Sequence, residues 1–243
     1  MAEFRNIPQT GARTGAAIDM GLRAYMLKVY NYMAAGLALT GLSAVGTYNL
    51  AVGADGLTPF GQALFASPLM WVLVLAPVGL VMFLSFRLHT LSVGTAQTVF
   101  WLYAALVGVS FASLGMVYTH GSIARVFMIT AATFGALSLY GYTTKRDLTG
   151  MGSFLFMGLI GIIIASVVNI FLASSALNFA LSIIGVLVFV GYTAYDSQKI
   201  KEMYYEGDGE TVMGQKAIGG ALRLYLDFIN LFLSLLRIFG NRN

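Results

Sequence analysis

The chain contains no cysteine, only 4 prolines and 2 histidines, and few charged side chains. Its 14 Lys and Arg and 10 Asp and Glu make up 10% of 243 residues. The absence of cysteine excludes disulfides, thiolate metal sites and cysteine nucleophiles. Soluble domains carry about 25% charged residues. Because so few charges cannot cover a water-soluble fold of this size, the composition indicates a protein embedded in lipid.

Hydrophobic residues make up 58% of the chain, or about 141 residues. A membrane-spanning helix needs about 20 mostly apolar residues, so this content is enough for about seven spans. The net charge of +4 has an ordinary explanation in a membrane protein, because surplus Lys and Arg gather in cytoplasmic loops. Nucleic-acid binding is therefore not expected.

Residues 1–24 are polar and lack the apolar segment of a signal peptide, so they are expected to form a polar cytosolic tail. The remainder, 25–243, is expected to form one transmembrane domain. Its predicted helices cover about 27–50, 69–87, 96–118, 123–143, 152–173, 176–204 and 219–239. The fold class predicted is an all-α membrane protein with a seven-transmembrane-helix bundle. The last segment is unusually polar and is also compatible with a re-entrant helix.

Lys and Arg are distributed unevenly between the two ends of these helices. With the N-terminus in the cytosol, ten lie on the cytosolic side and three on the opposite side, a bias that predicts this orientation. The ten are Arg5, Arg13, Arg23, Lys28, Arg87, Lys145, Arg146, Lys199, Lys201 and Lys216. The three are Arg125, Arg237 and Arg242.

Pro77 lies in the middle of the second predicted helix, 69–87. Because proline has no N–H, it cannot bond the carbonyl of Leu73, and a kink is expected there. The kink is either a static bend or a hinge, and both interpretations stay open.

Ionisable side chains inside a membrane span are costly and therefore indicate function. Asp196, Arg223 and Asp227 lie within predicted helices, and Arg87 ends the second one. Arg237, near the far end of the last helix, is expected to extend to the lipid headgroups.

Asp196 and Asp227 are expected to lie at similar depth. Their midpoint in the sequence falls between Thr211 and Val212, inside the polar loop 205–218. A helical hairpin folded about this loop brings both carboxylates to the cytosolic half of the bundle.

Two neighbouring carboxylates cannot both ionise cheaply, so the pair is expected to share a proton and to titrate as a unit. When fully ionised, it offers hard oxygen ligands suited to transient Ca²⁺ binding. Arg87 could neutralise the pair from the second helix, and Arg223, one turn before Asp227, could do so locally. A static buried salt-bridge network is the alternative interpretation.

Four motifs occur in order along the chain. They are Tyr-Gly-Tyr-Thr-Thr-Lys-Arg-Asp-Leu at 140–148, Phe-Met-Gly-Leu-Ile-Gly at 156–161, Gly-Tyr-Thr-Ala-Tyr-Asp-Ser-Gln-Lys-Ile at 191–200, and Leu-Tyr-Leu-Asp-Phe-Ile-Asn-Leu-Phe at 224–232. Together they resemble the Bax inhibitor-1 family, also called the transmembrane Bax inhibitor motif family, in its bacterial type. The resemblance runs from about Arg23 to Gly240, with Ser197 where many relatives carry threonine.

The resemblance implies a seven-helix bundle whose polar last helix is surrounded by the other six. It also implies a pH-sensitive calcium leak gated by a hydrogen-bonded aspartate pair, which matches Asp196 and Asp227. An arginine in the second helix, matching Arg87, would help latch the pair. Eukaryotic relatives suppress cell death and lower stored calcium, and some bacterial relatives are linked to a membrane protease.

An intramembrane aspartyl protease is the enzyme alternative, because two carboxylates sharing a proton can activate water. Such enzymes carry Gly-x-Gly before the second aspartate and a Pro-Ala-Leu element. Here Arg223-Leu-Tyr-Leu precedes Asp227, and no proline follows Pro77. We therefore expect no enzymatic activity.

Two other site types are disfavoured. A retinal protein needs a lysine in its last helix, and 219–239 contains none. The two histidines, His89 and His120, fall in loops on opposite sides, which disfavours a catalytic metal site. A third interpretation is a membrane protein that regulates other proteins by binding them and transports no ions.

The sequence therefore predicts a passive, proton-regulated path for cations, Ca²⁺ above all, with no cofactor. We expect it in a bacterial inner membrane, or in the endoplasmic reticulum if the source is eukaryotic. In one direction of gating, loss of the shared proton separates the carboxylates and moves the Arg87 end of the second helix about Pro77. In the other, protonation opens the path by releasing Arg87.

Overall fold

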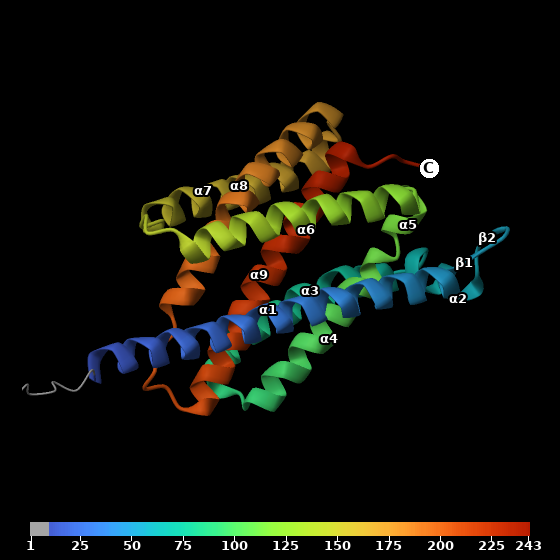
Figure 1. Cartoon of the computed structure of the whole chain (residues 1–243). Helices are drawn as coiled ribbons and strands as arrows, with labels where there is room; N and C mark the ends of the chain where they lie inside the picture. Colours follow the sequence, from blue (N-terminus) through green and yellow to red (C-terminus); the bar gives the residue numbers. More distant parts are fainter. Residues whose placement is uncertain (1–9) are drawn as a thin grey trace, which may run out of the picture.

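The computed structural model describes the backbone of residues 10–243, with side chains from residue 20 onward. Helices dominate it (Figure 1). The long ones are α1 (Thr10–Ala51), α3 (Leu69–Arg87), α4 (Val93–Phe111), α6 (His120–Thr143), α7 (Thr149–Leu172), α8 (Ser175–Glu202) and α9 (Glu210–Phe239). The short elements are the hairpin β1 (Val52–Gly53) and β2 (Gly56–Leu57), α2 (Pro59–Phe65), the 3₁₀ turn η1 (Leu88–Thr90) and α5 (Leu114–Val117).

Five helical segments are long and apolar enough to cross a membrane. They are Leu69–Thr90, Val93–Val117, His120–Thr143, Thr149–Leu172 and Ser175–Glu202. Helix α7 shows the reason most clearly, because Phe154, Ile164 and Phe171 are exposed large apolar side chains that only lipid can cover favourably. The all-α membrane class is thus confirmed, with five of the seven expected spans, while α1 and α9 fall outside these segments.

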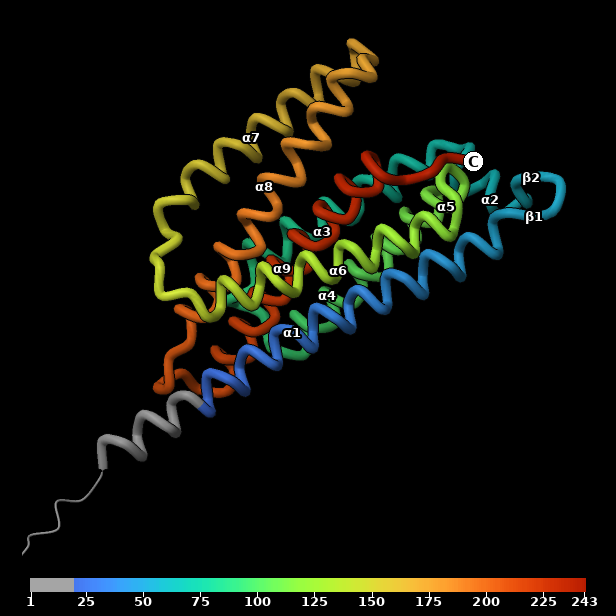
Figure 2. The backbone as a smooth tube through the Cα atoms, turned by 45° about the horizontal axis from the view of Figure 1, so that its top comes forward, coloured from blue at the N-terminus to red at the C-terminus, as the bar shows by residue number. Residues whose placement is uncertain are grey.

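Helix α9 lies inside the bundle and packs mainly against α8, α1, α6 and α4 (Figures 1 and 2). Helix α3 packs on the outside of α4, and helix α7 packs on the outside of α8. The resemblance implied six helices around the last one, whereas four of the long helices make its main contacts. Three polar residues of α9, Gln215, Asp227 and Ser234, are buried within the protein.

Tyr225 fixes the position of α9 in the bundle. Its side chain is fully buried, and its hydroxyl forms a 2.7 Å hydrogen bond with Thr40 Oγ1 of α1. Thr40 in turn donates to the carbonyl of Ala104 in α4 over 2.9 Å. The rings of Phe100 and Tyr103 pack edge-on to the Tyr225 ring. Tyr225 thereby joins three helices two residues before Asp227.

Pro77 lies inside α3, as the sequence predicts, and the structure shows what satisfies the backbone group that it frees. Ser110 Oγ of α4 donates to the Leu73 carbonyl over 2.8 Å. This is the carbonyl that an N–H at position 77 would have bonded. Helix α4 therefore supplies the hydrogen bond that Pro77 cannot make.

Ser110→Ala is expected to lower the free energy of unfolding by about 1–2 kcal/mol, because it leaves the Leu73 carbonyl without its donor. In a Pro77→Ala background the restored N–H can bond the same carbonyl, and the second loss should nearly vanish. A double-mutant cycle from thermal unfolding in detergent measures this coupling. Equal losses in both backgrounds would contradict the assignment.

Three predicted boundaries differ from the structure. The last helix, predicted over 219–239, begins as α9 at Glu210, so most of the predicted polar loop 205–218 is helical. Helix α1 begins at Thr10 rather than near residue 27, so the described part of the predicted 1–24 tail is helical; residues 1–9 lie outside the described chain. The predicted helix 96–118 ends as α4 at Phe111 and resumes as α5. At this break the Ser110 and Ser113 hydroxyls bond nearby backbone carbonyls, an alternative to helix continuation.

Candidate functional site

Asp196 of α8 and Asp227 of α9 lie side by side in the interior. The two helices pack against each other along the hairpin that the loop 203–209 closes. Asp196 is 8% exposed and Asp227 is 5% exposed, and their carboxyl groups are close enough to interact through a hydrogen bond. The two carboxyl groups lie together as predicted, although the predicted midpoint between Thr211 and Val212 falls inside α9 and not in the loop.

One carboxyl oxygen of the pair lacks a partner. Asp227 Oδ2 is buried and accepts no hydrogen bond from any residue that the structure describes. A buried polar atom of this kind costs free energy unless a proton, water or ion satisfies it. Among the described residues, protein groups therefore leave this oxygen unsatisfied.

Arg223 is the cation nearest this pair. Its Nη1 lies 4.0 Å from Asp196 Oδ1, with 54% of the Arg223 side chain exposed. Arg87 ends α3 with an exposed side chain, and no ion pair joins it to either aspartate in the described part of the chain. Its role as a latch remains a prediction, while Arg223 occupies the position of a local charge partner.

Close backbone contact positions Asp196. A Cβ atom at Gly141 of α6 would fall 2.1 Å from the Ala194 carbonyl oxygen, so the helices touch where only glycine fits. Gln198 adds a second attachment, because its side chain donates to the Arg146 carbonyl and accepts from the Leu148 amide, each over 2.8 Å. The loop from α6 to α7 is thus fastened to α8 beside Asp196.

A chain of hydroxyls crosses three helices on another face of α8. Tyr30 of α1 bonds Ser138 of α6 over 2.6 Å, and Ser138 bonds Ser197 over 2.7 Å. Ser197 donates onward to the Thr193 carbonyl over 2.7 Å. Sequence reasoning missed Tyr30 and Ser138, since residues 108 positions apart carry no local signal of contact.

Charged groups outside the apolar region close the hairpin and its neighbouring loop. Lys216 pairs with Asp208 and donates to the Met203 carbonyl. In the α6–α7 loop, hydrogen bonds from Thr149 hold the pKa of the Asp147 carboxyl below its usual value. Asp147 therefore remains an ordinary exposed carboxylate, which makes it a useful comparison for the buried pair.

The pair can supply at most four oxygens to a metal ion, fewer than the six to eight that Ca²⁺ takes. No group of three or more His, Asp or Glu side chains suited to a metal occurs in the described range. His89 lies in η1 and His120 begins α6, so they are 31 residues apart in the sequence. The arrangement suits brief contact with a hydrated cation better than a retained one.

Comparison with known proteins agrees with this description. Residues 22–243 match the family model described as "Inhibitor of apoptosis-promoting Bax1". The chain is 50% identical over 224 residues to the uncharacterized protein RP147 of Rickettsia prowazekii, covering 92% of each chain. It is 49% identical over 225 residues to the inner membrane protein YbhL of Escherichia coli K12, covering 91% of this chain and 93% of YbhL.

Fold and site together define an all-helical integral membrane protein that buries two carboxyl groups on its innermost helix. Bacterial relatives named as membrane proteins extend to Streptococcus pyogenes, where SpyM3_0260 is 34% identical over 229 residues and 93% of this chain. The chain belongs to the Bax inhibitor-1 family.

Proposed function

We propose that this protein is a passive calcium leak path closed by a proton shared between Asp196 and Asp227. The observation that carries the proposal is the buried pair itself, with one oxygen lacking a protein partner. Carboxyl groups in such a setting are expensive to keep and are expected to serve transport or proton sensing. We further propose seven spans, with α1 and α9 completing the five apolar ones, in a bacterial inner membrane.

The proposed orientation places the N-terminus in the cytosol. The loop ends that carry Lys145, Arg146, Lys199, Lys201 and Lys216 lie on the same side of the bundle as the start of α1. Because cytoplasmic loops carry surplus Lys and Arg, this side is cytosolic. The aspartate pair then lies nearer the cytosolic surface than the outer one.

Gating follows from the cost of a second buried charge. At low pH one proton bridges the two carboxyl groups and holds α8 against α9. As the pH rises, the proton leaves, the carboxylates repel each other, and the helices separate enough to admit a cation. Arg223 lies at the edge of this pair and screens part of the repulsion.

Movement of α8 and α9 is expected to displace the end of α3. Gln215 of α9 donates to the Leu91 carbonyl over 2.7 Å, and η1 packs on α9. A shift of α9 would therefore pull on the segment that contains Arg87, with Pro77 as the hinge. In this account the protein is not an enzyme and uses no cofactor, and Ca²⁺ and protons are its ligands.

The proposal is tested by calcium entry into dye-loaded liposomes that contain the purified protein and no other. We expect entry that rises between about pH 5 and about pH 8 by about tenfold, as a single proton-linked step allows. Empty liposomes are the control. Absence of calcium entry at every pH would overturn the proposal and favour a regulatory role toward other membrane proteins, such as a protease.

Arg223→Gln is expected to move the pH of half-maximal calcium entry upward, by less than about one unit. The positive charge favours loss of the shared proton, and a partly exposed ion pair contributes about 1 kcal/mol or less. Arg237→Gln, the same change near the far end of α9, is the matched control. A downward shift, or equal shifts in both variants, would contradict the assigned role.

A further inference from the structure

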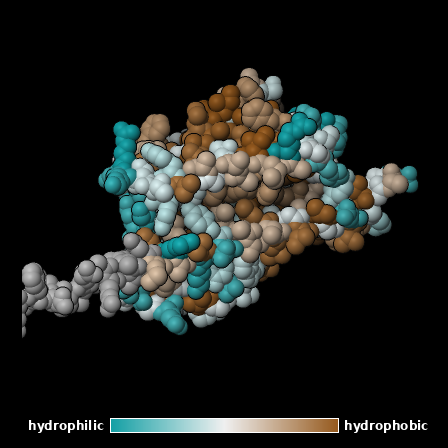
Figure 3. All heavy atoms as spheres, in the orientation of Figure 1, coloured by the Kyte–Doolittle hydropathy of each residue, from teal (hydrophilic) through white to brown (hydrophobic). Residues whose placement is uncertain are grey.

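A long groove separates α1 from α6, with α9 as its floor. Its volume is about 1430 Å³. The α1 wall carries Met26, Met33 and Gly41, and the α6 wall carries Gly135. Phe228 of α9 is part of the floor and directly follows Asp227. Figure 3 shows hydrophobic residues lining the recess between the two helices.

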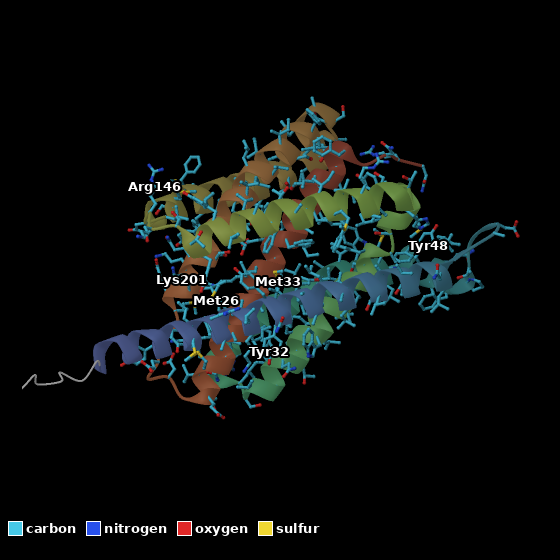
Figure 4. The ribbon with its side chains drawn as sticks, in the orientation of Figure 1. Met26, Tyr32, Met33, Tyr48, Arg146 and Lys201 are labelled. Carbon is cyan, nitrogen blue, oxygen red and sulfur yellow. The ribbon has the colours of Figure 1, made fainter. Side chains whose placement is uncertain are left out.

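The groove crosses the whole apolar layer. Its lining on α1 runs from Arg23 to Asn49, about 39 Å at 1.5 Å per residue. The hydrocarbon core of a bilayer is about 30 Å thick. Figure 4 shows Met26 and Lys201 near one end and Tyr48 near the other. The groove is therefore long enough to cross the hydrocarbon core.

Its size favours acyl chains over other occupants. Small-molecule sites usually have about 300–1,000 Å³, less than this groove. A transmembrane helix about 10 Å wide and 30 Å long occupies roughly 2,400 Å³, so it would lie in the groove only with part of its surface outside. A methylene group takes roughly the 30 Å³ of a liquid water molecule, so two acyl chains of about 16 carbons need about 1,000 Å³.

One end of the groove carries a positively charged side chain. Arg23 lines it there with an exposed side chain. Tyr142 lines the same end, and Lys201 donates to its carbonyl over 2.8 Å. The opposite end presents the uncharged amide of Asn49 and the packed rings of Tyr48 and His120. A guanidinium binds phosphate with paired hydrogen bonds, so the charged end complements a lipid headgroup.

We propose that this groove binds one phospholipid of the leaflet at the Arg23 end. Its phosphate contacts Arg23, and its acyl chains lie over Met33 along the Phe228 floor. The Tyr30–Ser138 hydrogen bond joins the two walls near the headgroup end, and the acyl chains lie beyond it. This binding depends on the membrane location and not on calcium leak, so either proposal can fail without the other.

Two glycines in the groove walls are suitable sites for substitutions that block it. A Cβ atom at Gly41 or Gly135 would meet no atom within 4 Å, so a phenylalanine at either position projects into the groove without displacing protein. Gly161 of α7 is equally open but lies outside the groove, so Gly161→Phe is the matched control. Arg23→Gln removes the headgroup contact and leaves the groove unfilled.

The experiment offers equal amounts of phosphatidylglycerol and phosphatidylcholine to the purified full chain in detergent and counts bound lipid by native mass spectrometry. We expect one phospholipid on the parent and on Gly161→Phe, with phosphatidylglycerol favoured about threefold. Gly41→Phe and Gly135→Phe should each retain about fivefold less. Arg23→Gln should lose the preference for the anionic lipid.

Three results would overturn the proposal. The parent could retain no phospholipid, or both groove variants could retain as much as Gly161→Phe. A photoreactive side chain at position 135 could instead cross-link to a second polypeptide and not to lipid, which would assign the groove to a partner helix. Circular dichroism of each variant establishes that reduced binding does not come from unfolding.

Discussion

Asp227→Asn is expected to give low calcium entry that changes less than about twofold between about pH 5 and about pH 8, where the parent changes about tenfold. Asparagine cannot ionise, yet its side-chain N–H can donate to Asp196 in place of the shared proton. The pair then stays closed at every pH. Calcium entry into liposomes containing the variant alone measures this effect.

The matched control is Asp147→Asn, the same chemical change at an exposed carboxylate whose pKa lies below its usual value. This variant should keep the full pH response of the parent. Asp196→Asn should resemble Asp227→Asn. If Asp227→Asn retained the parent's pH response, another group would control the path.

Gly141→Ala is expected to cause the largest loss of stability of any single methyl addition considered. The added Cβ would lie 2.1 Å from the Ala194 carbonyl oxygen, a backbone atom that cannot move without shifting α8. Overpacking of this kind costs about 1–3 kcal/mol, or roughly 3–10 °C in melting temperature. Thermal unfolding in detergent measures the change.

Gly135→Ala supplies the comparison within the same helix. Its Cβ meets no atom within 4 Å, and alanine is favoured over glycine in helices by up to about 1 kcal/mol. The melting temperature of this variant should therefore be unchanged or slightly raised. Equal destabilisation by both changes would show that glycine flexibility, rather than close contact, is what α6 requires.

The proximity of the acidic pair was predicted from one helical hairpin. Counting from a polar loop at 205–218 predicted that Asp196 and Asp227 lie at the same depth. The two groups do lie together, but this count does not explain it, because the loop is 203–209: Asp196 lies 6 residues before the end of α8 at Glu202, and Asp227 lies 17 residues after the start of α9 at Glu210. The contribution of Arg223 followed from its spacing of one turn from Asp227. Arg87 was harder to place, because its position depends on how α3 packs outside α4.

The seven long helices were also predictable, since apolar composition and length determine most of them. The ends of these helices were less predictable from the sequence. The extension of α1 to Thr10 continues through a polar segment, which composition alone assigns to a tail. The break after Phe111 depends on serine hydroxyls that bond the backbone, and one of them also bonds Leu73 in another helix.

Contacts between distant helices could not be predicted from one sequence. The Tyr30–Ser138–Ser197 chain and the Thr40–Tyr225 bond join residues with no shared local pattern. The groove between α1 and α6 likewise depends on how two distant helices are placed, and the Tyr30–Ser138 hydrogen bond joins its walls at one point.

The central claim is that the Asp196–Asp227 pair holds one proton that closes the path. The most direct measurement is the infrared band of protonated carboxyl groups, followed by pH titration of the parent and of Asp227→Asn in liposomes. The account predicts a parent band that disappears over the pH range in which calcium entry rises, and that Asp227→Asn lacks. A pair that is ionised at every pH, or a band that titrates outside that range, would contradict it.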